Sequence, residues 1–237
     1  RGAVVRVWDR RVGAGVAAYS TFRTERCGRL DRTLDAMLTI SFASPERRDE
    51  MLERLRRGHA RVVGTTEAGD RYDANDPELQ YWVLATLVDT TFEVERRYVG
   101  VMSRSDRERF FQESKLLARA FGIAEEHIPA DLDAFRAPPT DAELATLEPS
   151  DATRQVTRAL MRPGLRWVPD QSFVPLNWVT AELLPSRLRG KLGVEDLNSA
   201  ELAAVRSARL MARSTLPRLH HALTTNPWST RVLRAAA

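Results

Sequence analysis

Apolar residues recur along the chain at the three- and four-residue spacing of amphipathic helices, and alternating strand-like runs are scarce. Residues 82–92 are apolar over most of a helical circumference, which is typical of a helix buried in a core. Residues 61–73 differ, because short β-favouring pieces flank a glycine turn and predict a small hairpin. The pattern therefore predicts an all-α fold: one multi-helix globular domain over residues 1–237, with at most this hairpin as β-structure.

Prolines preceded by capping residues place several helix starts. The Ser-Pro pair at 44–45 and the Asp-Pro pair at 76–77 each combine an N-cap with proline at the first helical position. Gly100 is expected to close the second of these helices. In the first, one side carries the apolar positions and His59, while arginines and acidic residues cover the other. The residues expected on the apolar side are Leu52, Leu55, His59, Val62 and Val63.

Later boundaries are predicted in the same way. Ser105 with Glu108 matches a capping box, and Gly122 is expected to end that helix. Residues 140–143 match a second capping box. Proline-rich segments at 138–139 and 163–169 indicate loops, and prolines at 175 and 185 bracket a further helix. The last helix is expected from Ser199 to about Leu223, with a bend at Pro217.

Composition narrows the function classes. The chain has 237 residues, 43% of them hydrophobic, and a net charge of +4. All basic residues except Lys115 and Lys191 are arginines, and no basic run is interleaved with aromatic residues, so we expect an arginine-rich solvated surface and no nucleic-acid partner. No stretch reaches the roughly 18 to 20 apolar residues of a membrane span. The lone Cys27 fits a reducing compartment, and we expect a cytoplasmic protein. Since the chain starts at Arg1, we expect an N-terminal segment to be missing, which leaves export open.

Several common catalytic motifs are missing from the sequence. There is no phosphate-binding P-loop, no nucleophile elbow and no H-E-x-x-H zinc motif. The four histidines are at 59, 127, 220 and 221, and the last two are adjacent and point to different sides of a helix. A multi-histidine zinc or non-haem iron centre is therefore not expected.

The remaining candidate centres on His59. This histidine lies on the apolar side of its predicted helix, with Arg56 one turn before it. On the preceding helix, Arg29 and Thr33 are four residues apart and share a face. Haem iron takes a neutral imidazole as axial ligand, and arginines bind its propionates. The same spacing also fits a structural histidine at the edge of a core, with Arg56 at the surface.

Four blocks of the sequence resemble the family of MpaB-type oxygenases, which includes the latex-clearing rubber oxygenases. They are residues 28–42 (G-R-L-D-R-T-L-D-A-M-L-T-I-S-F), 56–66 (R-R-G-H-A-R-V-V-G-T-T), 76–92 (D-P-E-L-Q-Y-W-V-L-A-T-L-V-D-T-T-F) and 183–189 (L-L-P-S-R-L-R). The blocks keep the family's order along nearly the whole chain. The resemblance implies a helical fold that holds haem b and uses O2 to cleave carbon–carbon double bonds, as in polyisoprene or a prenyl side chain.

The resemblance also implies roles for individual residues. The family's axial histidine matches His59, which would be the iron ligand, and the arginine three residues earlier matches Arg56. The arginine and threonine of the family's R-x-x-x-T pattern match Arg29 and Thr33. These two would hold a propionate or orient a ligand on the opposite face of the haem. We thus expect a haem b-dependent oxygenase whose substrate is an apolar, unsaturated molecule such as a polyisoprenoid, with O2 as co-substrate.

Three positions depart from the family. Many relatives have H-P where this chain has Asp9-Arg10, and many have a histidine where it has Tyr19. Many also read W-V-H-A where this chain reads W-V-L-A, so that Leu84 takes the place of a histidine. These departures favour an alternative: a non-catalytic helical scaffold that binds a small apolar ligand or a partner protein. A third reading, an electrostatic binder of nucleic acid or anionic membrane, is opposed by the scattered arginines. The oligomeric state is left open by the sequence.

Overall fold

The computed structural model describes residues 9–19, 26–100, 102–136, 149–161, 169–184 and 186–216. Helices dominate this part of the chain, and the all-α prediction is confirmed. The elements are, in order, α2 (Arg10–Tyr19), α3 (Arg26–Phe42), α4 (Pro45–His59), β1 (Val63–Thr65), β2 (Arg71–Asp73), α5 (Pro77–Val94), η2 (Glu95–Val99), α6 (Arg104–Ala120), η3 (Glu125–His127), α7 (Leu132–Phe135), α9 (Asp151–Met161), η4 (Asp170–Phe173), α10 (Val174–Leu183), α11 (Ser186–Leu192) and α12 (Ser199–Thr215).

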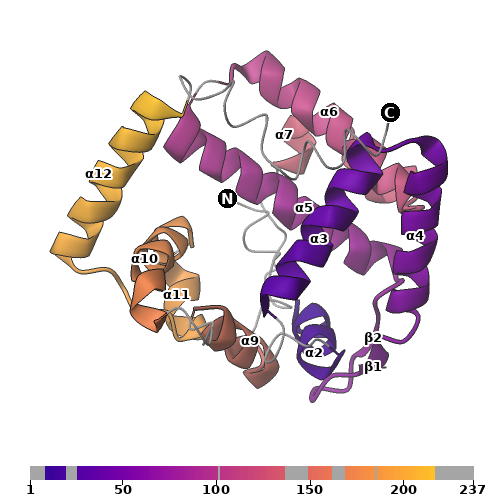
Figure 1. Ribbon diagram of the computed structural model, residues 1–237. Helices are drawn as coiled ribbons and strands as arrows, with labels where there is room; N and C mark the ends of the chain where they lie inside the picture. The colour runs from indigo at the N-terminus through magenta and orange to yellow at the C-terminus, as the bar shows by residue number, and fades with distance from the viewer. Residues whose placement is uncertain are drawn as a thin grey trace.

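Helix α5 crosses the centre of the molecule (Figure 1). Helices α6 and α7 lie along one side of it, and α3 and α4 form a neighbouring pair. Helix α12 contacts the π-helical turn η2 at the end of α5, and it also contacts α10. Helix α9 contacts α11 and α2, and α2 in turn contacts the hairpin. The hairpin is the expected small sheet, with β1 and β2 antiparallel and Gly64 opposite Tyr72.

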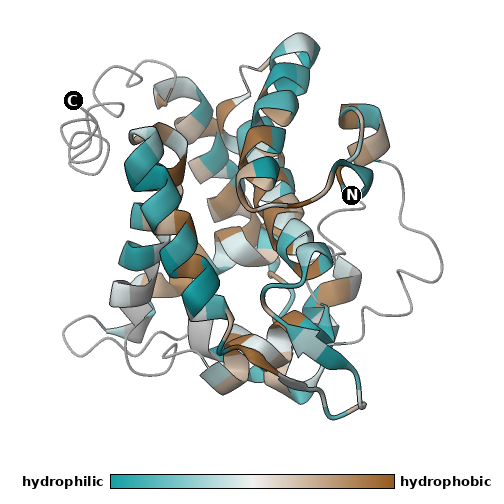
Figure 2. Cartoon of the chain, turned by 90° about the vertical axis from the view of Figure 1, so that its right-hand side faces the viewer, coloured by the Kyte–Doolittle hydropathy of each residue, from teal (hydrophilic) through white to brown (hydrophobic). Residues whose placement is uncertain are grey.

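The main hydrophobic core lies between α5, α6 and the segment that follows α6. Leu84, Ala85, Val88 and Phe92 of α5 pack there against apolar residues of the other two elements. The remaining buried members are Phe111, Ala118, Ile123, Ile128, Leu132 and Phe135. Removing such apolar surface from water is the main favourable contribution to folding. Most helices accordingly carry hydrophilic and hydrophobic residues on different faces (Figure 2).

The burial of α5 is less complete than its apolar composition predicts. Val83 and Leu87 are 42% and 46% exposed, although they lie within the run expected to be buried. They are four residues apart and share one face, whereas Leu84 and Val88 face the core. The helix is therefore two-sided in this structure, with one apolar face left at the surface.

Most predicted helix ends are confirmed, with two corrections. Helices α4 and α5 begin at Pro45 and Pro77, and Gly100 closes η2 with a left-handed backbone (φ 72°). The capping box predicted at Ser105 and Glu108 is wrong: Ser103 and Asp106 form it, since each side chain there accepts from the other residue's backbone N–H.

The second correction concerns the end of α4. The helix ends at His59, so Val62 and Val63, expected on its apolar side, belong to the hairpin segment instead. The chain turns there because the backbone N–H of Val62 donates to the carbonyl of His59 at 2.7 Å. The predictions for residues 138–143, for most of 163–169, for Pro185 and for the segment beyond Leu216 lie outside the described residues.

Within the described ranges, no helix is both long enough and apolar enough to span a bilayer.

Candidate functional site

Helices α3 and α4 carry the predicted site residues in their halves away from the connection between the two helices. A two-residue connection joins the helices, and an ion pair between Asp35 and Arg54 (3.6 Å) links their facing sides. The two helices run in opposite directions, so the start of α3 and the end of α4 both lie away from this connection. At about 1.5 Å rise per residue, Arg29 and His59 are each roughly 20 Å from it along their helix. Thr33 lies about one turn nearer. The two helices diverge toward the ends that carry Arg29 and His59 (Figure 1).

Packing fixes the connected half of the pair. Ala36 and Ile40 of α3 are buried against Met51 and Leu52 of α4, and Leu55 packs at the edge of this cluster. The apolar contact stops one turn before His59. Packing therefore fixes the connected half of the α3–α4 pair, and Arg29, Thr33 and His59 lie beyond this packed cluster.

His59 is half-buried at the last position of α4. Its Nδ1 atom is buried and has no hydrogen-bond partner, and no hydrogen bond involves either ring nitrogen within the described residues. Burial lowers the pKa of the imidazole, and the charge of Asp73 opposes this shift only in part. The ring is therefore the neutral form at pH 7, which is the form that binds a metal. The buried Nδ1 atom is thus left without the hydrogen bond that a buried polar atom usually makes.

Arg56 and Thr33 are exposed. The Arg56 guanidinium forms an ion pair with Glu53 at 3.6 Å, and its backbone carbonyl accepts from the side-chain amide of Asn75 at 3.1 Å. An exposed ion pair of this kind contributes little to stability, so Arg56 can exchange Glu53 for another carboxylate at low cost. The structure describes the backbone of Arg29 in the first turn of α3.

The three positions that depart from the family have structural partners here. Asp9 is 3% exposed, and its carboxylate accepts a hydrogen bond from the backbone N–H of Arg11 at 2.8 Å. The guanidinium of Arg11 also donates two hydrogen bonds to this carboxylate, which makes a bidentate ion pair. The Tyr19 hydroxyl donates to the carbonyl of Val63 at 2.8 Å, which joins α2 to the hairpin. Leu84 lies in the main core. None of the three is left without a role in the fold.

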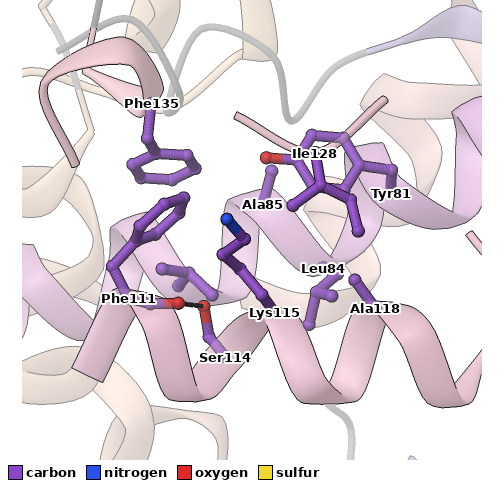
Figure 3. A pocket seen from close by; sticks show the side chains of 10 residues that line it. Tyr81, Leu84, Ala85, Phe111, Ser114, Lys115, Ala118, Ile128 and Phe135 are labelled. Atoms are coloured by element: carbon purple, nitrogen blue, oxygen red, sulfur yellow. Dashed lines mark hydrogen bonds between the residues drawn. The ribbon is translucent and has the colours of Figure 1, made fainter. Parts of the chain in front are cut away.

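A small pocket lies elsewhere, between α5, α6 and the chain around Ile128 and Phe135 (Figure 3). Its cavity volume is about 10 Å³, and none of Arg29, Thr33, Arg56 or His59 lines it. Since ligand pockets usually measure about 300 Å³ or more, this space does not suit a porphyrin.

The same pocket contains Lys115, which the sequence analysis did not single out as a site residue. A signal for it is present in the sequence. Lys115 is one of two lysines in an arginine-rich chain, and it falls at the spacing of Phe111 and Ala118, on the apolar face of α6. No group of three or more histidine, cysteine or acidic side chains is arranged to hold a metal ion in the described ranges.

Comparison with known proteins identifies the family. A family model described as "ER-bound oxygenase mpaB/B'/Rubber oxygenase, catalytic domain" matches residues 1–216. No curated protein and no solved structure matches the chain. The match covers most of the 237 residues, and it includes every block on which the resemblance was noted. The chain therefore belongs to the mpaB/rubber-oxygenase family of oxygenase catalytic domains.

Proposed function

We propose that this chain is a haem b-dependent oxygenase in which His59 is the axial ligand of the iron. The observation that carries the proposal is a neutral imidazole whose buried Nδ1 atom makes no hydrogen bond, at the open end of a helix pair in an oxygenase family. A buried ring nitrogen without a partner is uncommon in a purely structural histidine, because an unmade hydrogen bond there costs free energy.

The donor set of the open end fits haem b. His59 supplies one nitrogen ligand, and the arginines at 29 and 56 supply positive charge for the two propionates. Haem iron, when bound, supplies the one-electron and O2 chemistry that amino-acid side chains lack. The protein's part is to hold the imidazole on a rigid helix and to pair the propionates with arginine.

We propose an apolar, unsaturated substrate with O2 as co-substrate, as the family description suggests for such a domain. An alkene carries no charge for this chain's polar groups to bind, so its affinity must come from apolar surface removed from water. Thr33, in the same half of α3 as Arg29, would supply a hydroxyl group to orient a polar group of the ligand.

A second candidate function is a non-catalytic scaffold that binds an apolar ligand or a partner protein. The observation that favours it is the structural use of all three positions at which the family pattern is lost. Leu84 in particular fills core space where many relatives have a polar ring. Protein that stays haem-free yet binds a lipid-like ligand would support this function over the first.

The deciding experiment is an ultraviolet–visible spectrum of the purified chain supplemented with haem, followed by a pyridine haemochrome assay. We expect a Soret band from bound haem b, and we expect His59→Ala to abolish or strongly shift it because the axial nitrogen is lost. His127→Ala is the matched control, since His127 is an exposed histidine of η3. A wild-type protein without a Soret band, or a band equal in His59→Ala and wild type, would contradict the proposal.

A further inference from the structure

Helix α12 lies along one edge of the molecule and presents two large apolar side chains to solvent (Figure 1). Its main contacts are with η2 and α10, and Val205 is buried on this inner side. Leu210 and Met211 face away from Val205, because five and six residues along a helix lead to its far side. They are 70% and 64% exposed, more than any other large apolar side chain that the structure describes.

The outer face around Leu210 and Met211 has no charge of its own. Its other residues are small and exposed, namely Ala203, Ala204, Ser207 and Ser214. The Ser214 hydroxyl donates to the backbone carbonyl of Met211 at 2.9 Å, so this hydroxyl is satisfied within the helix. Two apolar side chains therefore protrude from an uncharged surface, and removing them from water would be favourable.

Positive charge borders this face on one flank. Arg206 and Arg213 are seven residues apart on the same side of α12, and both are exposed. Among the described residues neither forms an ion pair with a carboxylate, and Arg213 donates to the backbone carbonyl of Arg96 at 3.2 Å. From Arg206 to Thr215 the helix has no acidic residue, and Glu201 caps its other end. The outer face thus combines protruding apolar side chains with two cations.

We propose that the outer face of α12 binds the surface of a membrane that contains anionic lipids. Leu210 and Met211 enter the boundary between headgroups and acyl chains, and Arg206 and Arg213 pair with lipid phosphates. Helices that lie on membranes have this composition, with apolar side chains on one face and basic side chains beside them. Anionic headgroups attract arginines held close to the surface. This binding is separate from His59 and does not depend on the proposed oxygenase activity.

The charge pattern favours a lipid surface over a second copy of the chain. A two-fold contact places the same patch on both partners. Two copies packed through Leu210 and Met211 would therefore bring Arg206 and Arg213 of each copy together without a carboxylate from this half of the helix. Like charges placed together oppose association. Anionic lipids supply the opposite charge, and their fluid acyl chains accept protruding side chains without a preformed groove.

Vesicle co-sedimentation of the purified chain tests the proposal. Vesicles of equal parts phosphatidylglycerol and phosphatidylcholine are compared with vesicles of phosphatidylcholine alone. We expect the chain to sediment with the anionic vesicles and to be released as the salt concentration rises. Arg206→Gln should weaken the vesicle affinity about fivefold, which is the contribution of one cation near an anionic surface. Leu210→Glu should weaken it at least about tenfold, because an apolar side chain no longer leaves water.

Leu116→Glu is the matched control. Leu116 is a 61% exposed leucine of α6, so the substitution changes the net charge equally at another surface, and it should leave the affinity unchanged. If Leu210→Glu does not fold, Arg206→Gln is compared with Arg109→Gln, which removes an exposed arginine of α6.

Three results would overturn the proposal. The first is a wild-type chain that does not sediment with the anionic vesicles. The second is an equal loss of vesicle affinity in a variant of α12 and in its control on α6, because binding would then follow net charge alone. The third is a wild-type dimer, measured by size-exclusion chromatography with light scattering, that Leu210→Glu converts to a monomer. A second copy of the chain would then cover this face.

Discussion

The charge of Glu93 depends on its immediate partners. This half-buried side chain of α5 receives hydrogen bonds at 2.8 Å from both Arg96 and Arg97. Burial alone raises the pKa of the carboxyl group, but the hydrogen bonds and charges of the two arginines outweigh it, and the net pKa is lowered. Glu93 is therefore ionised in the native state even at mildly acidic pH, and its ionised form stabilises the fold.

The lowered pKa predicts a pH-dependent effect of Glu93→Gln. The native pKa of Glu93 lies below the unfolded value of about 4.3. The stabilisation from the ionised carboxylate is therefore complete above the unfolded pKa, and it is lost as pH falls through the native pKa. At neutral pH we expect the substitution to lower the free energy of unfolding by about 1 to 2 kcal/mol. The difference between variant and wild type should shrink as the pH falls below about 4. Urea titrations at several pH values measure it.

Glu126→Gln is the control for this prediction, because Glu126 is exposed and belongs to the short helix η3. Its effect should stay within about 0.5 kcal/mol at every pH. A Glu93→Gln deficit that stays constant down to pH values well below the native pKa would show that packing, rather than charge, makes the contribution of Glu93.

At the scale of elements, helices α2 and α9 touch through a glycine. A Cβ atom added at Gly13 would lie closer to Thr153 Oγ1 than van der Waals contact allows. Thr153 is itself 2% exposed and hydrogen-bonds to Ser150, so it has little room to move. The absence of a side chain at Gly13 thus lets the two helices approach each other.

This contact predicts opposite results for two glycine substitutions. Gly13→Ala should lower the free energy of unfolding by about 1 to 3 kcal/mol, because the added methyl group overpacks the crossing. Gly190→Ala is the matched control in helix α11, where an added Cβ meets no atom within 4 Å. There alanine should raise stability by about 0.5 to 1 kcal/mol through its better helix propensity. Chemical denaturation of both variants measures the contrast, and equal effects would disprove the close crossing.

Element boundaries were the most predictable level of this structure. Pro45 and Pro77 mark helix starts by local chemistry alone, since proline lacks the N–H that a first turn leaves unbonded. The capping box was predicted two residues late because Ser103 and Ser105 both precede an acidic residue by three positions. The sequence does not indicate which pair bonds reciprocally. Only the position of the helix start decides that, and it depends on tertiary packing.

Side-chain environments were harder to predict than boundaries. The apolar periodicity predicted that His59 lies on the apolar side of its helix, and in the structure the ring is half-buried and its Nδ1 atom has no hydrogen-bond partner. The burial of Lys115 was not predicted from the sequence, because lysine side chains usually lie at the protein surface. The carbonyl that Lys115 contacts belongs to Ala130, in a loop after α6 that no helical period describes.

At the scale of the whole molecule, Glu182 connects three helical segments. It lies on α10, and its carboxylate pairs with Arg97 of η2 at 2.8 Å and with Arg209 of α12. Arg97 also donates to the backbone carbonyl of Glu182 at 2.6 Å. The glutamate is only 14% exposed, so removing its charge would leave two arginines facing one another with little solvent between them. These contacts link residues 85 and 27 positions apart, and no local pattern predicts them.

The position of Glu182 predicts that it holds α12 against the rest of the fold. In Glu182→Gln we expect a loss of about 2 kcal/mol in the free energy of unfolding. We also expect faster backbone hydrogen exchange across α12, since its remaining ties to η2 and α10 include a single hydrogen bond from Arg213 to the carbonyl of Arg96 at 3.2 Å. Glu113→Gln, which removes an exposed partner of Arg109 at 3.9 Å, should change neither quantity measurably. Unchanged exchange in α12 of Glu182→Gln would mean that apolar contacts such as that of the buried Val205 hold the helix without the ion pairs.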